Sequence, residues 1–248
     1  MEKNYMATKC ENCPLRPLAI FNPMTDREVG FMQKFKAGEL EVEAGTPLMM
    51  EGSNSPQLYT VLEGMGLRYK TLESGERTVI NFVFPGDFIG LQAGVMKEMQ
   101  HSVEATTAMK LCVFDRKMLW TMFNEQPERS FDLTWIAAVE EHILGESLSI
   151  IGQLDGASRI ARAFVRINDR ASALGMVKGT ETPLPYRQQD LADSLGLSLV
   201  HTNKTLKTLR ENNIATWRDG VLNILNYGAL CNVAQLDTDR DPMTRPLI

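Results

Sequence analysis

The sequence of 248 residues lacks the features that mark membrane and secreted proteins. No apolar run approaches the roughly 20 residues that span a bilayer. Residues 1–9 show neither an apolar core nor a cleavage pattern, so no signal peptide is expected. The four cysteines are too few to suggest a disulfide framework in a chain of this length, which leaves metal binding, redox chemistry or burial for them. We therefore expect a cytoplasmic protein that makes no membrane contact.

Residues suited to catalysis are also scarce. The chain has only three histidines, and it contains no nucleophile elbow, no phosphate loop with its lysine and no His-Glu-x-x-His motif. We therefore do not expect an enzyme. The net charge is −5, so any binding to nucleic acid must come from a local basic face and not from the protein as a whole.

Glycine punctuates the first half of the chain. Between residues 35 and 114, glycines separate short alternating or wholly apolar runs at 58–62, 66–69, 78–84 and 109–114. Regular short strands with glycine at the turns are typical of an antiparallel sandwich or barrel. No long helical segments alternate with these strands, so we do not expect a doubly wound fold.

The apolar period changes after Pro127. Apolar residues that include Ile136, Val139, Ile143 and Ile150 recur at steps of three, four and seven, which places them on one face of a helix. Such a helix would be on the order of 37 Å long. Two interpretations stay open: a helix of the protein's own core, or a coiled-coil seam between two subunits.

Residues 187–206 carry the most specific pattern. Leu191, Leu195 and Leu197 are spaced to join two short helices, and Gly196 lies where the intervening turn needs a left-handed conformation. Ser198 is placed to cap the second helix, which would present polar and basic side chains to a DNA major groove. The candidate DNA-binding residues are Arg187, Gln188, Ser198, Val200, His201, Asn203, Lys204 and Lys207.

A β-hairpin is expected directly after these helices, because Asp219-Gly220 favours a two-residue turn between the flanking apolar residues. A hairpin in this position is a wing. The alternative is a helical hairpin and a turn that serve only as core.

These patterns divide the chain into five parts. They are an arm with a short helix (1–34), a β-rich domain (35–126), a long helix (127–154), a winged helix-turn-helix domain (155–231) and a polar tail (232–248). The fold class is therefore α+β. We expect the tail to join no core, and we expect Arg159, Arg162 and Arg166 to form a solvated face.

Across nearly its full length the chain resembles the Crp/Fnr family of bacterial transcriptional regulators. The resemblance rests on Gly45, Gly52, Gly64, Gly75, the run Pro-Gly-Asp-Phe-Ile-Gly at 85–90, Ala-Ser-Arg-Ile-Ala at 157–161 and the helix-turn-helix at 191–206. It implies a cyclic-nucleotide-binding-type β-roll (a double-stranded jelly roll), a dimerisation helix and a winged helix-turn-helix. It also implies a homodimer on palindromic double-stranded DNA, with half-sites about one helical turn apart, and contact with RNA polymerase.

The sequence departs from the family members that bind cyclic AMP. Leu91 stands where those members have a ribose-binding Glu, and His101 stands where they have a phosphate-binding Arg. Leucine cannot hydrogen-bond a ribose hydroxyl, and histidine lacks the guanidinium fork. Cyclic AMP is therefore not expected as the signal.

The Fnr-like members hold an iron–sulfur cluster through an N-terminal cysteine group and one distant cysteine. Cys10, Cys13 and Cys112 match three of these positions, whereas Ala19 replaces the fourth. The resemblance thus implies a metal site at these three cysteines, completed by Cys231, a carboxylate such as that of Asp26, or an external ligand.

Other interpretations of the cysteines stay open. They are a thiol redox switch, a zinc site, or no chemistry at all, with Cys112 and Cys231 simply buried. The protein would then respond to a small molecule or a partner, or to no ligand. A further alternative is a cyclic-nucleotide-binding module that regulates another protein, although such a module needs no groove-reading helix.

Overall fold

The computed structural model describes residues 7–240 and 243–248 and divides the chain into two compact units. Unit 1 comprises Met1–Lys70, Phe82–Ala137 and Thr244–Ile248, and unit 2 comprises Thr71–Asn81 and Ala138–Met243. None of the described helices is long and apolar enough to cross a membrane.

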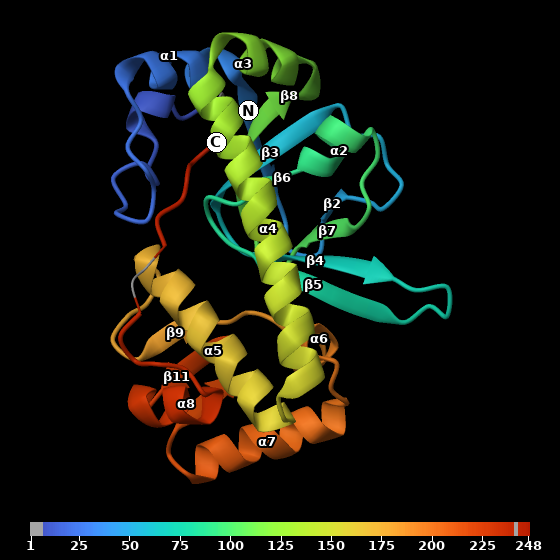
Figure 1. The fold of residues 1–248 in the computed structure, drawn as a ribbon, viewed down its shortest axis with the longest axis vertical. Coiled ribbons are helices and arrows are strands. Elements are labelled where there is room, and N and C mark those ends of the chain that lie inside the picture. The colour runs from blue at the N-terminus through green and yellow to red at the C-terminus, as the bar shows by residue number, and fades with distance from the viewer. Residues whose placement is uncertain (1–6, 241–242) are drawn as a thin grey trace, which may run out of the picture. The chain divides into compact units, whose positions relative to one another are not determined.

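Two four-stranded sheets form the β-roll, and every strand pair whose register is described is antiparallel (Figure 1). One sheet has the order β1 (Lys36–Val42), β8 (Met109–Asp115), β3 (Gln57–Glu63) and β6 (Phe88–Ile89). The other has the order β2 (Pro47–Met49), β7 (Ser102–Ala105), β4 (Gly66–Thr71) and β5 (Arg77–Val83). The predicted antiparallel β domain is confirmed, and each of the four predicted apolar runs lies on a strand except for Phe84, which follows the end of β5.

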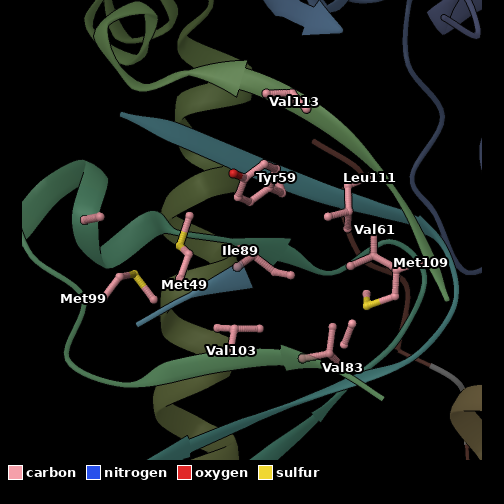
Figure 2. Packing of buried hydrophobic residues seen from close by; sticks show 12 residues of the cluster. Met49, Tyr59, Val61, Val83, Ile89, Met99, Val103, Met109, Leu111 and Val113 are labelled. Atoms are coloured by element: carbon pink, nitrogen blue, oxygen red, sulfur yellow. The ribbon is translucent and has the colours of Figure 1, made fainter. Parts of the chain in front are cut away.

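The core of the roll lies between the sheets, where Tyr59, Ile89 and Val103 meet (Figure 2). Strand β8 sends Leu111 and Val113 into this core. Because successive side chains of a strand alternate, Cys112 must project from the opposite face of the same sheet. That outer face positions the cysteine pocket described below.

Helix α1 (Asp26–Phe35) covers the outer face of this sheet. Thr25 and Glu28 form a capping box at its start, and the Phe35 ring stacks on that of Phe114 with centroids 4.8 Å apart. The other short helices of unit 1 are η1 (Cys10–Asn12), α2 (Leu91–Met96), η2 (Arg116–Met118) and α3 (Leu119–Glu125).

The long helix is α4, Pro127–Gln153, and it is continuous as the sequence predicts. Ile136 and Ile150 are already buried within the single chain. The exposed apolar residues in its second half are Leu144, Leu148 and Ile151, with 45%, 73% and 36% of their surface accessible. Their steps of four and three place them on one face of the helix.

Unit 2 is a winged helix-turn-helix domain. Its helices are α5 (Gly156–Ala173), α6 (Gln188–Leu195), α7 (Leu199–Glu211) and α8 (Tyr227–Ala234), and its sheet has the order β10 (Ala215–Arg218), β11 (Val221–Ile224) and β9 (Glu181–Pro183). Helix α8 runs across residue 231, where the sequence predicts that this domain ends. Cys231 is fully buried, which agrees with the packing role considered for that residue.

The expectation of a solvated arginine face on α5 is wrong. Arg159 donates to the Leu195 carbonyl at the end of α6 at 3.1 Å, and Arg162 donates to the Ala234 carbonyl at the end of α8 at 2.7 Å. Arg166 pairs with Glu146. The last carbonyls of a helix lack partners within the helix, and guanidinium groups from a neighbouring helix satisfy them here.

The expectation that the tail joins no core is also wrong. Thr244–Ile248 belongs to unit 1, and Leu247 and Ile248 are each only 4% exposed. The polar composition of 232–248 hid the two apolar residues at its end, which are the ones that pack. Figure 1 shows this red end of the chain among the elements of unit 1.

Candidate nucleic-acid interface and cysteine pocket

The turn between α6 and α7 has the geometry that the sequence predicts. Gly196 ends α6 in the left-handed region with φ 62°. The Ser198 hydroxyl then caps α7 by accepting a hydrogen bond from the His201 backbone N–H at 3.2 Å. These two residues fix the angle at which α7 leaves α6.

Helix α7 separates its buried and exposed faces cleanly. Thr202, Thr205 and Leu209 are buried. Val200, 80% exposed, Asn203, Lys204 and Lys207 lie in solvent. An exposed helix face with two lysines and an amide can supply both phosphate contacts and base contacts in a major groove.

The remaining predicted DNA-binding residues are exposed too, but besides Ser198, which caps α7, two of them contact other parts of the protein. The Arg187 guanidinium forms a two-point contact with the buried Asp190 carboxylate, at 2.7 and 3.1 Å. The His201 ring packs over Gly156, where an added Cβ would lie 2.1 Å from Nε2. Gln188 and Ser198 lie exposed at the starts of α6 and α7.

The hairpin after α7 is a two-residue turn between β10 and β11. Asp219 and Gly220 both have positive φ, 50° and 75°, which matches the mirror-image turn that the Asp-Gly pair favours. The Trp217 indole N–H donates to the Leu184 carbonyl at 3.0 Å and anchors the hairpin to the strand before α6. The wing is thus held against the domain, and its turn is held there too, because the Leu184 N–H donates to the Gly220 carbonyl at 2.7 Å.

Unit 1 contains a second site, a small cavity on the outer face of the β-roll. We call it the cysteine pocket. Its lining consists of Thr8, Cys10, Cys13, Arg16, Met24, Met32, Lys36, Thr60, Leu62, Cys112, Phe114, Leu247 and Ile248. The sheet supplies its floor, and the arm, α1 and the end of the chain supply its walls. The three cysteines that the sequence singled out therefore line one cavity.

A buried ion pair holds the arm over this pocket. The Lys36 ammonium, with its side chain only 3% exposed, lies 2.7 Å from Glu39 and donates to the Thr8 carbonyl at 2.6 Å. Glu39 also accepts from the Thr8 N–H at 2.8 Å and pairs with Lys110 at 2.9 Å. Burial alone would raise the pKa of Glu39, but the hydrogen bonds from the two lysines outweigh it and lower that pKa to about 2.

Burial raises the pKa of two thiols of the pocket, those of Cys112 and Cys10. Burial raises the pKa of Cys112 to about 12, although the nearby Lys36 ammonium opposes that rise. Burial also raises the pKa of Cys10. Since the thiolate is the form that binds metals and reacts, burial lowers the reactivity of both thiols.

The pocket residues do not fit a four-thiolate iron–sulfur cluster as they lie. The lining offers three thiols and no carboxylate or imidazole as a fourth ligand. Within the described residues, no three His, Cys, Asp or Glu side chains lie close enough to hold a metal ion. Cys231 is buried in unit 2 and Asp26 does not line the pocket, so neither completes the set.

Sequence reasoning missed several residues that line the pocket or lie beside it. Lys36, Glu39 and the end of the chain carry no motif, and their role depends on long-range pairing. Glu39 lies opposite Cys112 in the β1–β8 register, and Thr60 lies opposite it in the β3–β8 register. Only the alternation of β8 could have indicated that Cys112 faces away from the core.

Two family models match the chain. One describes a cyclic nucleotide-binding domain and matches residues 39–126, and the other describes a Crp-like helix-turn-helix domain and matches residues 158–233. Together they span most of the chain.

Curated relatives match over most of their length. The chain is 27% identical to the transcriptional activatory protein AadR of Rhodopseudomonas palustris, a match that covers 88% of this chain and 92% of that protein. It is 25% identical to the transcriptional activator protein FnrL of Cereibacter sphaeroides, over 86% of this chain and 84% of that protein. The solved structure of FixK2 from Bradyrhizobium japonicum shares the fold, with a TM-score of 0.71 and 22% identity over 82% of this chain and 98% of that one.

Proposed function

Because the chain belongs to the Crp/Fnr family of DNA-binding transcriptional regulators, we propose that it binds a palindromic site as a homodimer and that events at the cysteine pocket set its DNA affinity. Its role is regulation of transcription and not catalysis. A regulator of this kind works where the DNA lies, in the cytoplasm, and acts on transcription by RNA polymerase.

The observation that carries the DNA part is the exposed face of α7. Val200, Asn203 and Lys204 occupy its N-terminal half, the part that contacts base edges in helix-turn-helix proteins. Lys207 lies one turn further on and suits a phosphate contact. We propose that Arg187, Gln188, Ser198 and His201 contact the DNA backbone. Arg187 and His201 would first have to leave their contacts within the protein.

The dimer part is supported by the surface of α4. The sequence predicts a seam of Ile136, Val139, Ile143 and Ile150, and this remains a prediction. Ile136 and Ile150 are already buried in one chain, whereas Leu144, Leu148 and Ile151 leave an apolar stripe in solvent. We propose that this stripe packs against its symmetry mate. Val139 and Ile143 lie roughly 100–150° around the helix from the centre of the stripe, so they belong to a different face of α4.

The signal part is supported by the convergence of three thiols in one small cavity. We propose a thiol-directed signal, such as oxygen, nitric oxide or a change in redox state. An iron–sulfur cluster would need a fourth ligand that the described pocket does not supply. Cyclic AMP is not expected, because burial lowers the pKa of His101 to about 4, so the residue that replaces the phosphate-binding Arg is neutral.

The DNA part is tested by comparing Lys204→Ala with Lys207→Ala on specific and random duplexes. Lys204→Ala should lose more affinity for the specific site, by about 1–3 kcal/mol, because a base contact is removed. Lys207→Ala should weaken both duplexes alike and reduce the salt dependence. Equal losses for Lys204→Ala would place this residue on the DNA backbone.

The signal part is tested with protein purified without oxygen. Iron content, absorption near 400 nm and DNA affinity are measured for the parent and for Cys112→Ser. A thiol-directed signal requires that Cys112→Ser abolish the response of DNA affinity to oxygen or nitric oxide. An unchanged response would make the cysteines structural and leave a small molecule or a partner as the signal. Iron that Cys112→Ser retains in full would exclude a cluster at this pocket.

A further inference from the structure

We propose that Thr244–Ile248, which we call the strap, is a lid over part of the cysteine pocket and must detach before a reagent larger than the small space inside reaches Cys112. The strap follows unit 2 in the sequence but belongs to unit 1. The inference depends on contacts within unit 1 and not on the proposed DNA-binding mode.

The strap is joined to the arm through its backbone. The Arg245 N–H donates to the Ile20 carbonyl and the Asn22 N–H donates to the Arg245 carbonyl, both at 2.8 Å, so that Arg245 pairs with Phe21 as an isolated parallel bridge. The Phe21 ring in turn lies on Gly86, where an added Cβ would be 2.2 Å from the ring. The strap therefore lies beside the arm, which itself packs on the Pro-Gly-Asp turn of the roll.

Side chains anchor the strap at three further points. Arg245 forms an ion pair with Asp87 at 2.7 Å, and the two side chains are only 13% and 12% exposed. Arg129, near the start of α4, donates to the Leu247 carbonyl at 3.4 Å. The Thr60 hydroxyl, on the floor of the pocket, donates to the Ile248 carbonyl. Contacts to β3, to α4 and to the turn before β6 are more than an unattached tail would make.

The last two residues of the strap form one wall of the cavity, which stays partly open to solvent. Leu247 and Ile248 are nearly fully buried and line the same pocket as Cys112. The remaining cavity is about 30 Å³, which has room for roughly two water molecules. A metal cluster, a nitrosating agent or an alkylating agent is larger than this space, so entry requires a wall to move. We take the strap as the wall that moves. It contains no helix or strand, and few backbone hydrogen bonds join it to the rest of unit 1.

The experiment measures how fast N-ethylmaleimide labels individual cysteines of the full-length native protein, with mass spectrometry of peptides as the readout. Cys231 serves as an internal reference, because it is fully buried in unit 2. Arg245→Ala removes the ion pair to Asp87 and should raise the rate at Cys112 by about tenfold or more while leaving Cys231 unchanged. Leu247→Ala shortens a side chain in the pocket wall and leaves the ion pair to Asp87 in place. It should also raise the labelling rate at Cys112.

Arg240→Ala is the matched control. Arg240 pairs with Asp169 at 2.6 Å and lies 3.8 Å from the Cys231 sulfur, so its loss should affect Cys231 and spare Cys112. The proposal is overturned if Arg245→Ala and Leu247→Ala both leave Cys112 labelling at the parent rate. It is equally overturned if they speed Cys112 and Cys231 alike, since that result reports general loosening. Neither outcome bears on whether α7 binds DNA.

Discussion

At the scale of single residues, Lys36 and Glu39 have two roles in the pocket. Their ion pair satisfies both backbone groups of Thr8, which holds the arm against the sheet. The same Lys36 ammonium faces Cys112 and opposes the effect of burial on that thiol. Any change that frees Lys36 from Glu39 therefore affects both arm attachment and thiol reactivity.

The low pKa of Glu39 predicts a loss of stability in acid. A carboxylate whose pKa falls from 4.5 to about 2 on folding contributes about 3 kcal/mol at neutral pH. Because the folded-state pKa is the lower one, this contribution is present above pH 4.5 and is lost as the pH falls toward 2. Urea unfolding of the parent and of Glu39→Gln at pH 6 and pH 3 should show their stability difference shrinking.

The control for this prediction is Glu41→Gln, an exposed carboxylate on the same strand. It should change stability little at either pH. A stability gap between the parent and Glu39→Gln that is the same at pH 6 and pH 3 would show that the carboxylate is not stabilised by the two lysines.

At the scale of elements, α7 depends on its N-terminal cap. The Ser198 hydroxyl caps this helix, and Ser198 is also one of the proposed DNA contacts, because a helix N-terminus that receives a phosphate also needs its own N–H groups satisfied. Two substitutions at this residue can separate the roles.

Ser198→Ala should destabilise the protein by about 1 kcal/mol, since alanine cannot accept the His201 N–H. Ser198→Asp keeps a cap and should leave the thermal midpoint near that of the parent. If Ser198 faces a phosphate, however, Ser198→Asp should bind DNA more weakly than Ser198→Ala. An Asp variant with parent-like DNA affinity would confine Ser198 to a structural role.

The exposed stripe of α4 makes a prediction for the assembly of the helix. Leu148→Glu places a charge at the most exposed apolar residue of the stripe and should produce monomers at micromolar concentration in sedimentation. Ser149→Glu adds the same charge about 100° around the helix and should leave the dimer intact. A dimeric Leu148→Glu together with a monomeric Ile143→Glu would place the seam on the face of Val139 and Ile143.

At the scale of the whole molecule, the features predictable from sequence are the local ones. Gly196, Ser198 and Asp219-Gly220 have roles decided within four residues, so a single sequence suffices to locate the turn, the cap and the wing. The strap could not be predicted in this way, because Arg245 pairs with Asp87, a residue 158 positions away in the sequence. The convergence of Cys112 with the arm cysteines likewise came from the family resemblance and not from spacing.

The strap also predicts a coupling between the two units. A palindrome with half-sites one helical turn apart requires two DNA-binding units held at a set spacing, and a tether from unit 2 back to unit 1 reduces the freedom that binding must remove. Arg245→Ala should therefore weaken binding to the full palindrome by about fivefold or more, within the usual range of such couplings. The Arg245→Ala protein should bind a single half-site duplex with the same affinity as the parent.

Met243→Ala, at an exposed neighbouring position, is the control and should alter neither affinity. Equal losses on the palindrome and the half-site would mean that Arg245→Ala damages the DNA-binding unit itself, and parent-like affinity for both would mean that the strap guards the pocket without restraining the DNA-binding unit.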